Sequence, residues 1–395
     1  MKVIIVDDTL VSWAGHSAEY DFAILNELAK RQIECQIFGQ KNISQFKDWA
    51  AKVKAAFRHT SGKVLFQGKI LPRFIFKIKG VCFTNFSHLF DLLRRVTACV
   101  KNNDLLLICD FSSRTSLAYA LWLFYLSALR RRLGVVIMVH GVPRYYGSWR
   151  LLKLLGRLHR LTLAALNQPV ADLCAKQTSL ECLVFPIPQT RLLPDSSGCE
   201  KISTGQVALA YLGVAIVEKG FDVLVDEISL LQDMFTAKRI TLTIQCNIIS
   251  ASPILEAARD KLLSLVKSIA GLKIIEGELP EEEFFNVLNA ADILLFPYQP
   301  EVYKYIQSAI FTQALTLGKV AICTAGSLAA GELQKYGSGL IYEYGVNGSL
   351  AKTIRQAVSN FEAMQEEAKI KRPLYYQIHN PRRYVDLLLG QRILV

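Results

Sequence analysis

The sequence lacks several features that would place the chain in a special class of protein. Its longest apolar run, Leu117 to Leu129, ends at Arg130 and falls well short of the roughly 20 residues that span a bilayer. Its nine cysteines form no Cys-x-x-Cys motif, so we expect reduced thiols and neither a disulfide framework nor a zinc site. There is no internal repeat and no low-complexity tract. With 51% hydrophobic and 20% charged residues, general disorder is excluded.

Acidic residues are scarce in the first half of the chain. Residues 1–190 contain 26 Lys and Arg against 12 Asp and Glu, whereas residues 191–395 contain 20 against 22. Within the first half, residues 51–101 contain eleven basic residues, seven phenylalanines and one acid, Asp91. A basic, aromatic segment of this kind suits an anionic bilayer surface or a nucleic acid. The alternative is a solvated basic face over ordinary core aromatics. Because no nucleic-acid module is present, we do not expect nucleic acid as a partner.

Strand-like and helix-like patterns alternate along the chain. The opening Met-Lys-Val-Ile-Ile-Val is too short an apolar run for a signal peptide and is expected to be the first strand. Strands are predicted near 2–7, 33–38, 104–109, 134–139, 162–166, 182–186, 207–212, 240–246, 272–276, 292–296, 319–323 and 339–342. Helices are predicted near 17–31, 86–101, 114–132, 149–160, 168–177, 220–233, 253–268, 281–290, 308–317 and 348–370. This alternation predicts an α/β fold with parallel sheets covered on both faces.

Residues 210–225 carry the first motif with chemical content. An apolar run ends at Gly213, and Glu218-Lys219-Gly220 precedes a new apolar run at helical spacing. A strand, a tight turn and a helix start in this order aim backbone N–H groups and one lysine at a phosphate. A solvated first helical turn is the alternative for the Glu-Lys pair.

Residues 290–327 carry the second motif, with Ala-Asp, Phe-Pro-Tyr, Ser308, Ala-Leu and Gly-Lys in order. Together with Glu-Lys-Gly, this order resembles the donor domain of the large retaining group of GT-B glycosyltransferases (glycosyltransferase group 1, family 4-like). The resemblance covers residues 205–345, and the first half is similar only in architecture. It implies two Rossmann-like, doubly wound parallel-sheet domains that face each other across a cleft.

The resemblance also implies domain bounds. Residues 1–188 would form the acceptor domain and residues 206–375 the nucleotide-sugar donor domain. Residues 189–205, rich in turn formers and without periodicity, are the expected linker. Residues 376–395 would form a terminal helix that crosses back to the first domain.

The resemblance assigns roles to individual residues. Lys219 would stabilise the leaving diphosphate, and His140, at a strand tip, would reach the donor sugar or the acceptor; these two are the expected catalytic residues. Arg144 would contact an anionic acceptor group. A structural histidine is the alternative for His140. The other implied donor-binding residues are Gly15, His16, Glu218, Gly220, Tyr298, Tyr305, Ser308, Ala309 and Gln313.

Three family positions differ in this chain. The common form of the turn is Gly-Arg-x-x-x-Glu-Lys-Gly, and here residues 214–216 are Val-Ala-Ile, with no arginine. Relatives carry two glutamates eight positions apart, where this chain has Tyr305 and Gln313. The amide oxygen of Gln313 could still accept a ribose hydroxyl. A tyrosine beside the donor sugar is harder to reconcile with the usual arrangement.

The resemblance therefore implies a retaining, hexosyltransferase-type enzyme. It would move a sugar from a nucleotide-activated donor, such as a UDP-sugar, to a glycan or lipid-linked acceptor in polysaccharide or cell-envelope biosynthesis. A catalytically degenerate GT-B protein that binds a nucleotide sugar or scaffolds a partner transferase is the alternative.

No metal and no cofactor are expected, because no Asp-x-Asp pair is placed to hold a cation and Asp7-Asp8 are predicted to cap a turn. We expect a cytoplasmic protein, attached peripherally to the inner face of the membrane through residues 69–101.

Overall fold

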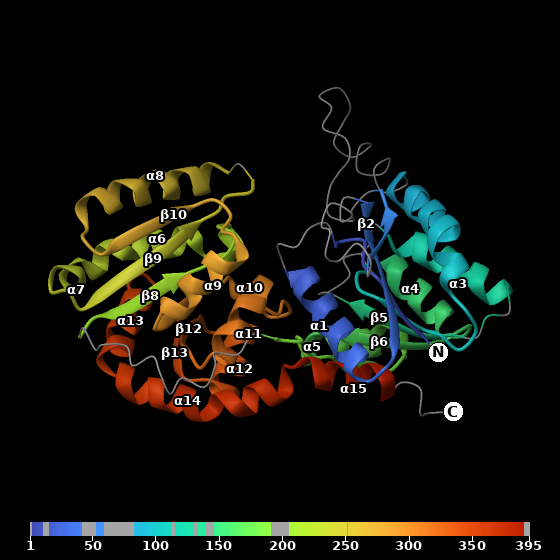
Figure 1. The fold of residues 1–395 in the computed structure, drawn as a ribbon. Helices are drawn as coiled ribbons and strands as arrows, with labels where there is room; N and C mark the ends of the chain where they lie inside the picture. Colours follow the sequence, from blue (N-terminus) through green and yellow to red (C-terminus); the bar gives the residue numbers. More distant parts are fainter. Residues whose placement is uncertain are drawn as a thin grey trace, which may run out of the picture. The chain divides into compact units, whose positions relative to one another are not determined.

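A computed structural model describes residues 2–10, 16–41, 53–58, 83–111, 115–129, 131, 133–139, 146–190, 205–250 and 252–390. The chain divides into two compact units, Met1–Thr190 with Asn380–Val395, and Arg191–His379 (Figure 1). Residues 191–204, most of the expected linker, lie outside the described residues. Each unit is a parallel sheet flanked by helices, which confirms the predicted pair of Rossmann-like α/β units.

The first unit is built on a seven-stranded sheet in the order β3-β2-β1-β4-β5-β6-β7, with every described strand pair parallel. Its central strands are buried on both faces, as expected for continuous apolar runs such as Leu105–Ile108. The strands are β1 (Lys2–Val6), β2 (Glu34–Gln40), β3 (Val53–Phe57), β4 (Leu105–Ile108), β5 (Gly134–Val139), β6 (Arg160–Ala165) and β7 (Cys182–Val184).

Helices cover both faces of this sheet. Right-handed crossovers between parallel strands place residues 83–99, α3 (Ser116–Ala128), α4 (Tyr146–Leu155) and α5 (Gln168–Thr178) on one face. The opposite face carries α1 (His16–Lys30) and, packed on it, the terminal helix α15 (Pro381–Gly390). Arg31 Nη1 donates to Asp386 Oδ1 at 2.7 Å, and the ring of Tyr384 meets Phe185 edge-on at 5.0 Å. The last helix therefore belongs to the core of the first unit.

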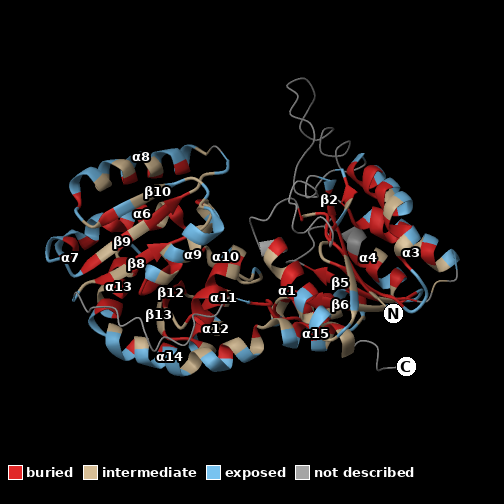
Figure 2. Cartoon of the chain, in the orientation of Figure 1, coloured by how far each residue is buried: buried red, intermediate tan, exposed pale blue. Residues whose placement is uncertain are grey.

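The second unit is built on a six-stranded sheet in the order β10-β9-β8-β11-β12-β13, again parallel in every pair. Its strands are β8 (Val207–Tyr211), β9 (Ile240–Cys246), β10 (Leu272–Glu276), β11 (Ile293–Phe296), β12 (Val320–Thr324) and β13 (Gly339–Tyr342). Its α-helices are α6 (Phe221–Glu227), α7 (Gln232–Thr236), α8 (Pro253–Ser268), α9 (Glu281–Ala290), α10 (Pro300–Tyr303), α11 (Ala309–Thr316), α12 (Leu328–Tyr336), α13 (Ser349–Ser359) and α14 (Phe361–Ile378). Apolar clusters fill both faces of the sheet, while the outer sides of α8 and α14 are exposed (Figure 2).

The elements follow the predicted alternation, with some differences. The strand β3 and the helices α10 and α12 are not predicted from the sequence. The helix expected over 348–370 is two helices separated at Asn360, and α14 continues to Ile378, so the terminal helix begins later than residue 376. The seven described cysteines are free thiols, as expected. None of the described helices combines the length and apolarity needed to cross a membrane.

Candidate functional site

A side chain from the neighbouring strand β9 fixes the backbone of the turn after β8. Gln245, at the end of β9, accepts a hydrogen bond from the Gly213 N–H at 2.8 Å and donates to the Gly277 carbonyl at 3.0 Å. Val214 pairs with Asn247 as a short continuation of the strand, and Ala215 is fully buried there. Residues 214–216, which lack the arginine expected from the resemblance, therefore lie at the edge of the sheet.

The chain then turns sharply before α6. Residues Val217–Lys219 form a single 3₁₀ turn, and Gly220 follows in the left-handed region at φ +64°. A side chain at Gly220 would collide with the carbonyl oxygen of Pro297, so only glycine fits. The Gln299 N–H donates to the Glu218 carbonyl at 2.9 Å. These contacts fix the Glu-Lys-Gly turn against the loop that follows β11.

Lys219 points back over the end of β8. Its amine lies 5.9 Å from the ring centroid of Tyr298 and makes neither an ion pair nor a hydrogen bond with any described residue. Burial of the amine lowers the pKa of Lys219 from 10.5 to about 8. The sheet edge thus holds a half-buried lysine that can still take a proton near neutral pH and has no carboxylate to neutralise it.

The first turn of α11 meets the same spot. Ser308 caps the helix by accepting a hydrogen bond from the Phe311 N–H at 3.3 Å, and the Tyr298 hydroxyl lies 3.2 Å from Ser308 Oγ. A Cβ built on Gly213 would stand 2.7 Å from Ile310 Cδ1 and 3.1 Å from Lys219 Nζ. The lysine amine and the Ile310 side chain, from the first turn of α11, therefore both lie against Gly213. An ammonium and a helix N-terminus both favour an anion, since the first amides of a helix lack internal acceptors and carry the positive end of its dipole.

The expected donor-site residues occupy different places around this point. Tyr298 is buried and supports Ser308 through its hydroxyl, and Glu218 is exposed on the turn. Gln313 is buried in α11, and Tyr305 lies half-buried in the loop before it, 5.6 Å from Lys304 Nζ. Ser308 and Ala309 begin α11. Lys219 and Ser308 both lie beside Tyr298, and Gly220 packs against Pro297. The donor-binding roles of all these residues stay predictions.

A buried network that the sequence did not indicate holds the loop before α11. Gln307 Nε2 donates to Glu332 Oε2 at 2.9 Å and to Thr312 Oγ1 at 3.2 Å, and the Tyr375 hydroxyl donates to the same Glu332 oxygen at 2.7 Å. Burial raises the pKa of Glu332. The partners come from α11, α12 and α14, so no local pattern could reveal them.

Most of the residues predicted for the first unit lie outside the described part of the chain. This holds for Gly15, His140 and Arg144, and His16 begins α1 without a described side chain. Their roles remain predictions.

Asp7 caps a turn, as predicted, by accepting hydrogen bonds from the Thr9 N–H at 2.7 Å and the Thr9 hydroxyl at 2.6 Å. Asp8 is also buried, and it faces His88 Nε2 at 3.1 Å and the Tyr119 hydroxyl at 3.2 Å. His88 Nδ1 lies 3.0 Å from the Thr84 carbonyl, which can only accept, so that ring nitrogen carries a hydrogen.

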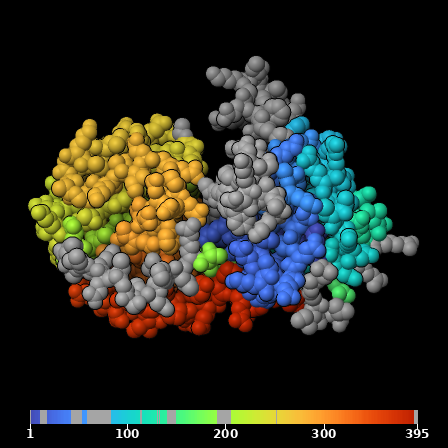
Figure 3. All heavy atoms as spheres, viewed as in Figure 1, coloured from blue at the N-terminus to red at the C-terminus, as the bar shows by residue number. Residues whose placement is uncertain are grey.

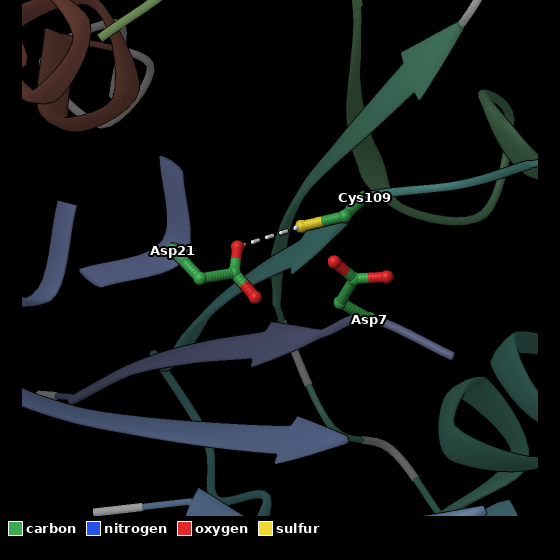
Figure 4. Close-up of side chains that lie close together, drawn as sticks. All are labelled: Asp7, Asp21 and Cys109. Atoms are coloured by element: carbon green, nitrogen blue, oxygen red, sulfur yellow. Dashed lines mark hydrogen bonds between the residues drawn. The ribbon is translucent and has the colours of Figure 1, made fainter. Parts of the chain in front are cut away.

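Asp7, Asp21 and Cys109 form a further buried group at the carboxyl end of β1 and β4 (Figure 4). One potential ligand atom from each lies within 4.8 Å of the others, and the Cys109 thiol donates to Asp21 Oδ1 at 3.7 Å. Burial raises the pKa of Asp7 to about 7 and those of Asp21 and Cys109 well above their usual values. The group holds protons at neutral pH that a cation would have to displace.

Comparison with known proteins supports the fold assignment. No protein-family model matches the sequence, and no curated protein matches it. Among solved structures, a glycosyltransferase from Rickettsia africae has a TM-score of 0.67 at 12% identity, covering 100% of this chain and 99% of that one. HepE from Anabaena in complex with UDP has a TM-score of 0.66 at 13% identity, covering 100% of both chains. Sucrose-phosphate synthase from Thermosynechococcus elongatus has a TM-score of 0.65 at 13% identity, covering 100% of this chain and 98% of that one.

The chain therefore has the two-sheet GT-B fold that these glycosyltransferases share. The resemblance inferred from two short motifs is confirmed at the level of fold across the whole chain, including the first half, where the sequence carries no motif of its own.

Proposed function

We propose that this protein is a glycosyltransferase that takes its sugar from a nucleotide diphosphate donor. The observation that carries the proposal is that Lys219 Nζ and Ile310, in the first turn of α11, both lie against Gly213. A half-buried ammonium close to the first turn of a helix is suited to a dianionic diphosphate. HepE, of similar fold, was solved with UDP and with UDP-glucose, so a UDP-sugar is the donor to test first.

The same groups supply what a transferase needs. As the bond to the sugar breaks, negative charge grows on the departing diphosphate, and Lys219 with the α11 amides stabilises it. The Gln307–Glu332 network keeps the loop before α11 rigid, which holds those amides in position. We propose a retaining, metal-independent reaction with a glycan or lipid-linked acceptor in envelope or polysaccharide synthesis. In such a reaction the protein mainly stabilises the leaving diphosphate and positions the acceptor.

Nucleotide binding provides the direct test. Calorimetry with UDP, GDP and ADP should show one binding site, and Lys219→Met should weaken the preferred nucleotide about ten- to a hundredfold, the worth of a charge-assisted hydrogen bond. Lys352→Met removes an exposed lysine from α13 and is the matched control, with affinity unchanged. If the Lys219→Met variant and the parent bind the nucleotide with equal affinity, the diphosphate does not bind at Lys219.

The second candidate is a GT-B protein that binds a nucleotide sugar without turning it over. Tyr305, Gln313 and the Val-Ala-Ile segment after Gly213 favour it, because each replaces a polar group expected near the donor. Release of UDP from a panel of UDP-sugars, with and without lipid and glycan acceptors, separates the two. Tight binding with no turnover on any acceptor would support the binding protein.

A further inference from the structure

One helix of the first unit exposes apolar side chains where a polar face is expected. The helix α3 contains no charged residue along its whole length. Its inner face is buried through residues such as Tyr119 and Trp122. On its outer face, Leu117, Leu121, Tyr125 and Leu129 are each 44–47% exposed. Their four-residue spacing makes one continuous stripe, the α3 stripe. A surface helix ordinarily carries polar residues on this side.

The neighbouring helical segment carries a second apolar stripe. Phe83, Phe86, Phe90 and Leu93 are 39–73% exposed, with Phe86 the most exposed of them. The spacing of three or four residues again selects one face of the helix. We call these four side chains the 83–93 stripe.

Hydrogen bonds join the two helical segments that carry the stripes. Asn85 Oδ1 accepts a hydrogen bond from the Ala118 N–H at 2.9 Å, and the Trp122 indole donates to Thr97 Oγ1 at 2.9 Å. Both helical segments lie on the same face of the sheet, so their outer sides share one surface (cyan and teal in Figure 3). Several exposed apolar side chains on neighbouring helical segments are typical of an interaction site.

The charges around the stripes have one sign. Residues 83–160 contain twelve Lys and Arg but only three acids, Asp91, Asp104 and Asp110. Asp91 and Asp104 are buried and bonded within the unit, and Asp110 is half-buried after β4. Six of these cations are exposed among the described residues, namely Arg94, Lys101, Arg150, Lys153, Arg157 and Arg160. The next helix, α5, exposes Asp172 and so marks the edge of the surface.

We propose that this surface docks on an anionic lipid leaflet, with the α3 stripe inserted among the acyl chains and the cations at the headgroups. A lipid surface is the occupant that takes exposed leucines and cations together. A second copy of the chain would bring two cationic surfaces into contact, and a nucleic acid would leave the leucines in water. The sequence pointed to residues 69–101 for this role; residues 69–82 lie outside the described part of the chain, and the described surface adds α3 and α4.

Flotation of the full-length protein with vesicles tests the proposal. We expect the protein to bind vesicles of phosphatidylcholine mixed with phosphatidylglycerol and to bind pure phosphatidylcholine poorly. Its binding to the mixed vesicles should weaken as NaCl rises from roughly 0.05 M to 0.5 M. The double variant Leu117→Gln with Leu121→Gln should lower partitioning about tenfold or more without changing charge. Circular dichroism and the melting temperature confirm that the variant folds.

A matched control exists in the second unit. Ile370 and Leu374 are exposed on α14 with the same four-residue spacing, so Ile370→Gln with Leu374→Gln makes an equal change elsewhere. Vesicle binding should be unaffected by it. The proposal fails if the parent ignores anionic vesicles, or if both double variants lose binding equally. It also fails if the α3 variant only breaks a dimer seen by light scattering, or if only DNA or RNA binds and the α3 variant keeps that affinity.

Discussion

The amine of Lys219 lies over Gly213, so that a Cβ on residue 213 would stand only 3.1 Å from Lys219 Nζ. The same Cβ would stand 2.7 Å from Ile310 Cδ1, and Gly213 has φ +102°, a region that side chains disfavour. A glycine at this point is what allows the lysine and the first turn of α11 to approach each other. The proposed diphosphate site therefore depends on the missing side chain at Gly213 as much as on Lys219 itself.

Gly213→Ala should damage both stability and nucleotide binding. The added methyl displaces Ile310 and Lys219 and forces a strained backbone, so we expect a loss of about 1–3 kcal/mol in unfolding free energy. Nucleotide diphosphate affinity should fall about tenfold or more. Urea denaturation and calorimetry measure the two effects. Gly331→Ala, in α12 with open space around it, is the control and should be neutral or slightly stabilising. A Gly213→Ala variant that binds UDP like the parent would contradict the site.

Nucleotide binding should weaken above pH 8. The pKa of Lys219 is about 8 in the free protein, and a bound diphosphate favours the charged amine, which raises that pKa. Binding near pH 8 must then take up a proton, while the nucleotide's own last phosphate proton is already lost near pH 6. Calorimetry in two buffers of different ionisation enthalpy measures the uptake. Affinity that stays constant from neutral pH to well above 8 would show that Lys219 makes no contact with the phosphates.

The carboxyl pair Asp7 and Asp21 should make the first unit less stable as pH rises. Burial raises the pKa of Asp7 from 3.8 to about 7 and raises that of Asp21 well above its usual value, so the folded chain keeps protons that the unfolded chain has released. Stability therefore declines between about pH 4 and 7. Asp21→Asn should flatten this decline and raise the unfolding free energy at pH 8 by about 1 kcal/mol. Its amide can still accept from the Cys109 thiol, which now donates to Asp21 Oδ1.

Asp226→Asn is the control for the carboxyl pair. Asp226 is exposed and paired with Lys261, so its removal should leave the pH slope unchanged. Chemical denaturation at several pH values measures both variants. The same slope for Asp21→Asn and the parent would show that the pair does not store protons.

Gln313→Glu should couple stability to nucleotide binding. The side chain is 8% exposed, so an unliganded carboxylate there loses hydration and the melting temperature should fall. If ribose hydroxyls reach this position, they donate to the carboxylate, and UDP should bind about fivefold or more tightly. Thermal shift with and without UDP, together with calorimetry, measures this. A variant that is destabilised and gains no affinity would exclude a ribose contact at Gln313.

The order of the elements was predictable from the sequence because strands and helices leave local patterns. Continuous apolar runs such as Leu105–Ile108 become buried parallel strands, and α8 and α9 match their predicted bounds. β3 was missed because the short edge strand Val53–Phe57 contains a lysine and two alanines and so has no continuous run of large apolar residues. The break at Asn360 was missed because helical periodicity continues on both sides of it.

The turn around Lys219 was also predictable, since Gly213, Lys219 and Gly220 lie within eight residues and their spacing fixes a local geometry. By contrast, three features depend on segments far apart in the chain. Lys219 loses solvent, and with it part of its basicity, through its position under Tyr298 and α11. Asp7, Asp21 and Cys109 meet only because β1, α1 and β4 are neighbours. The leucines of α3 stay exposed because no described element covers them. Whether a side chain is covered depends on the tertiary packing, which the local sequence does not determine.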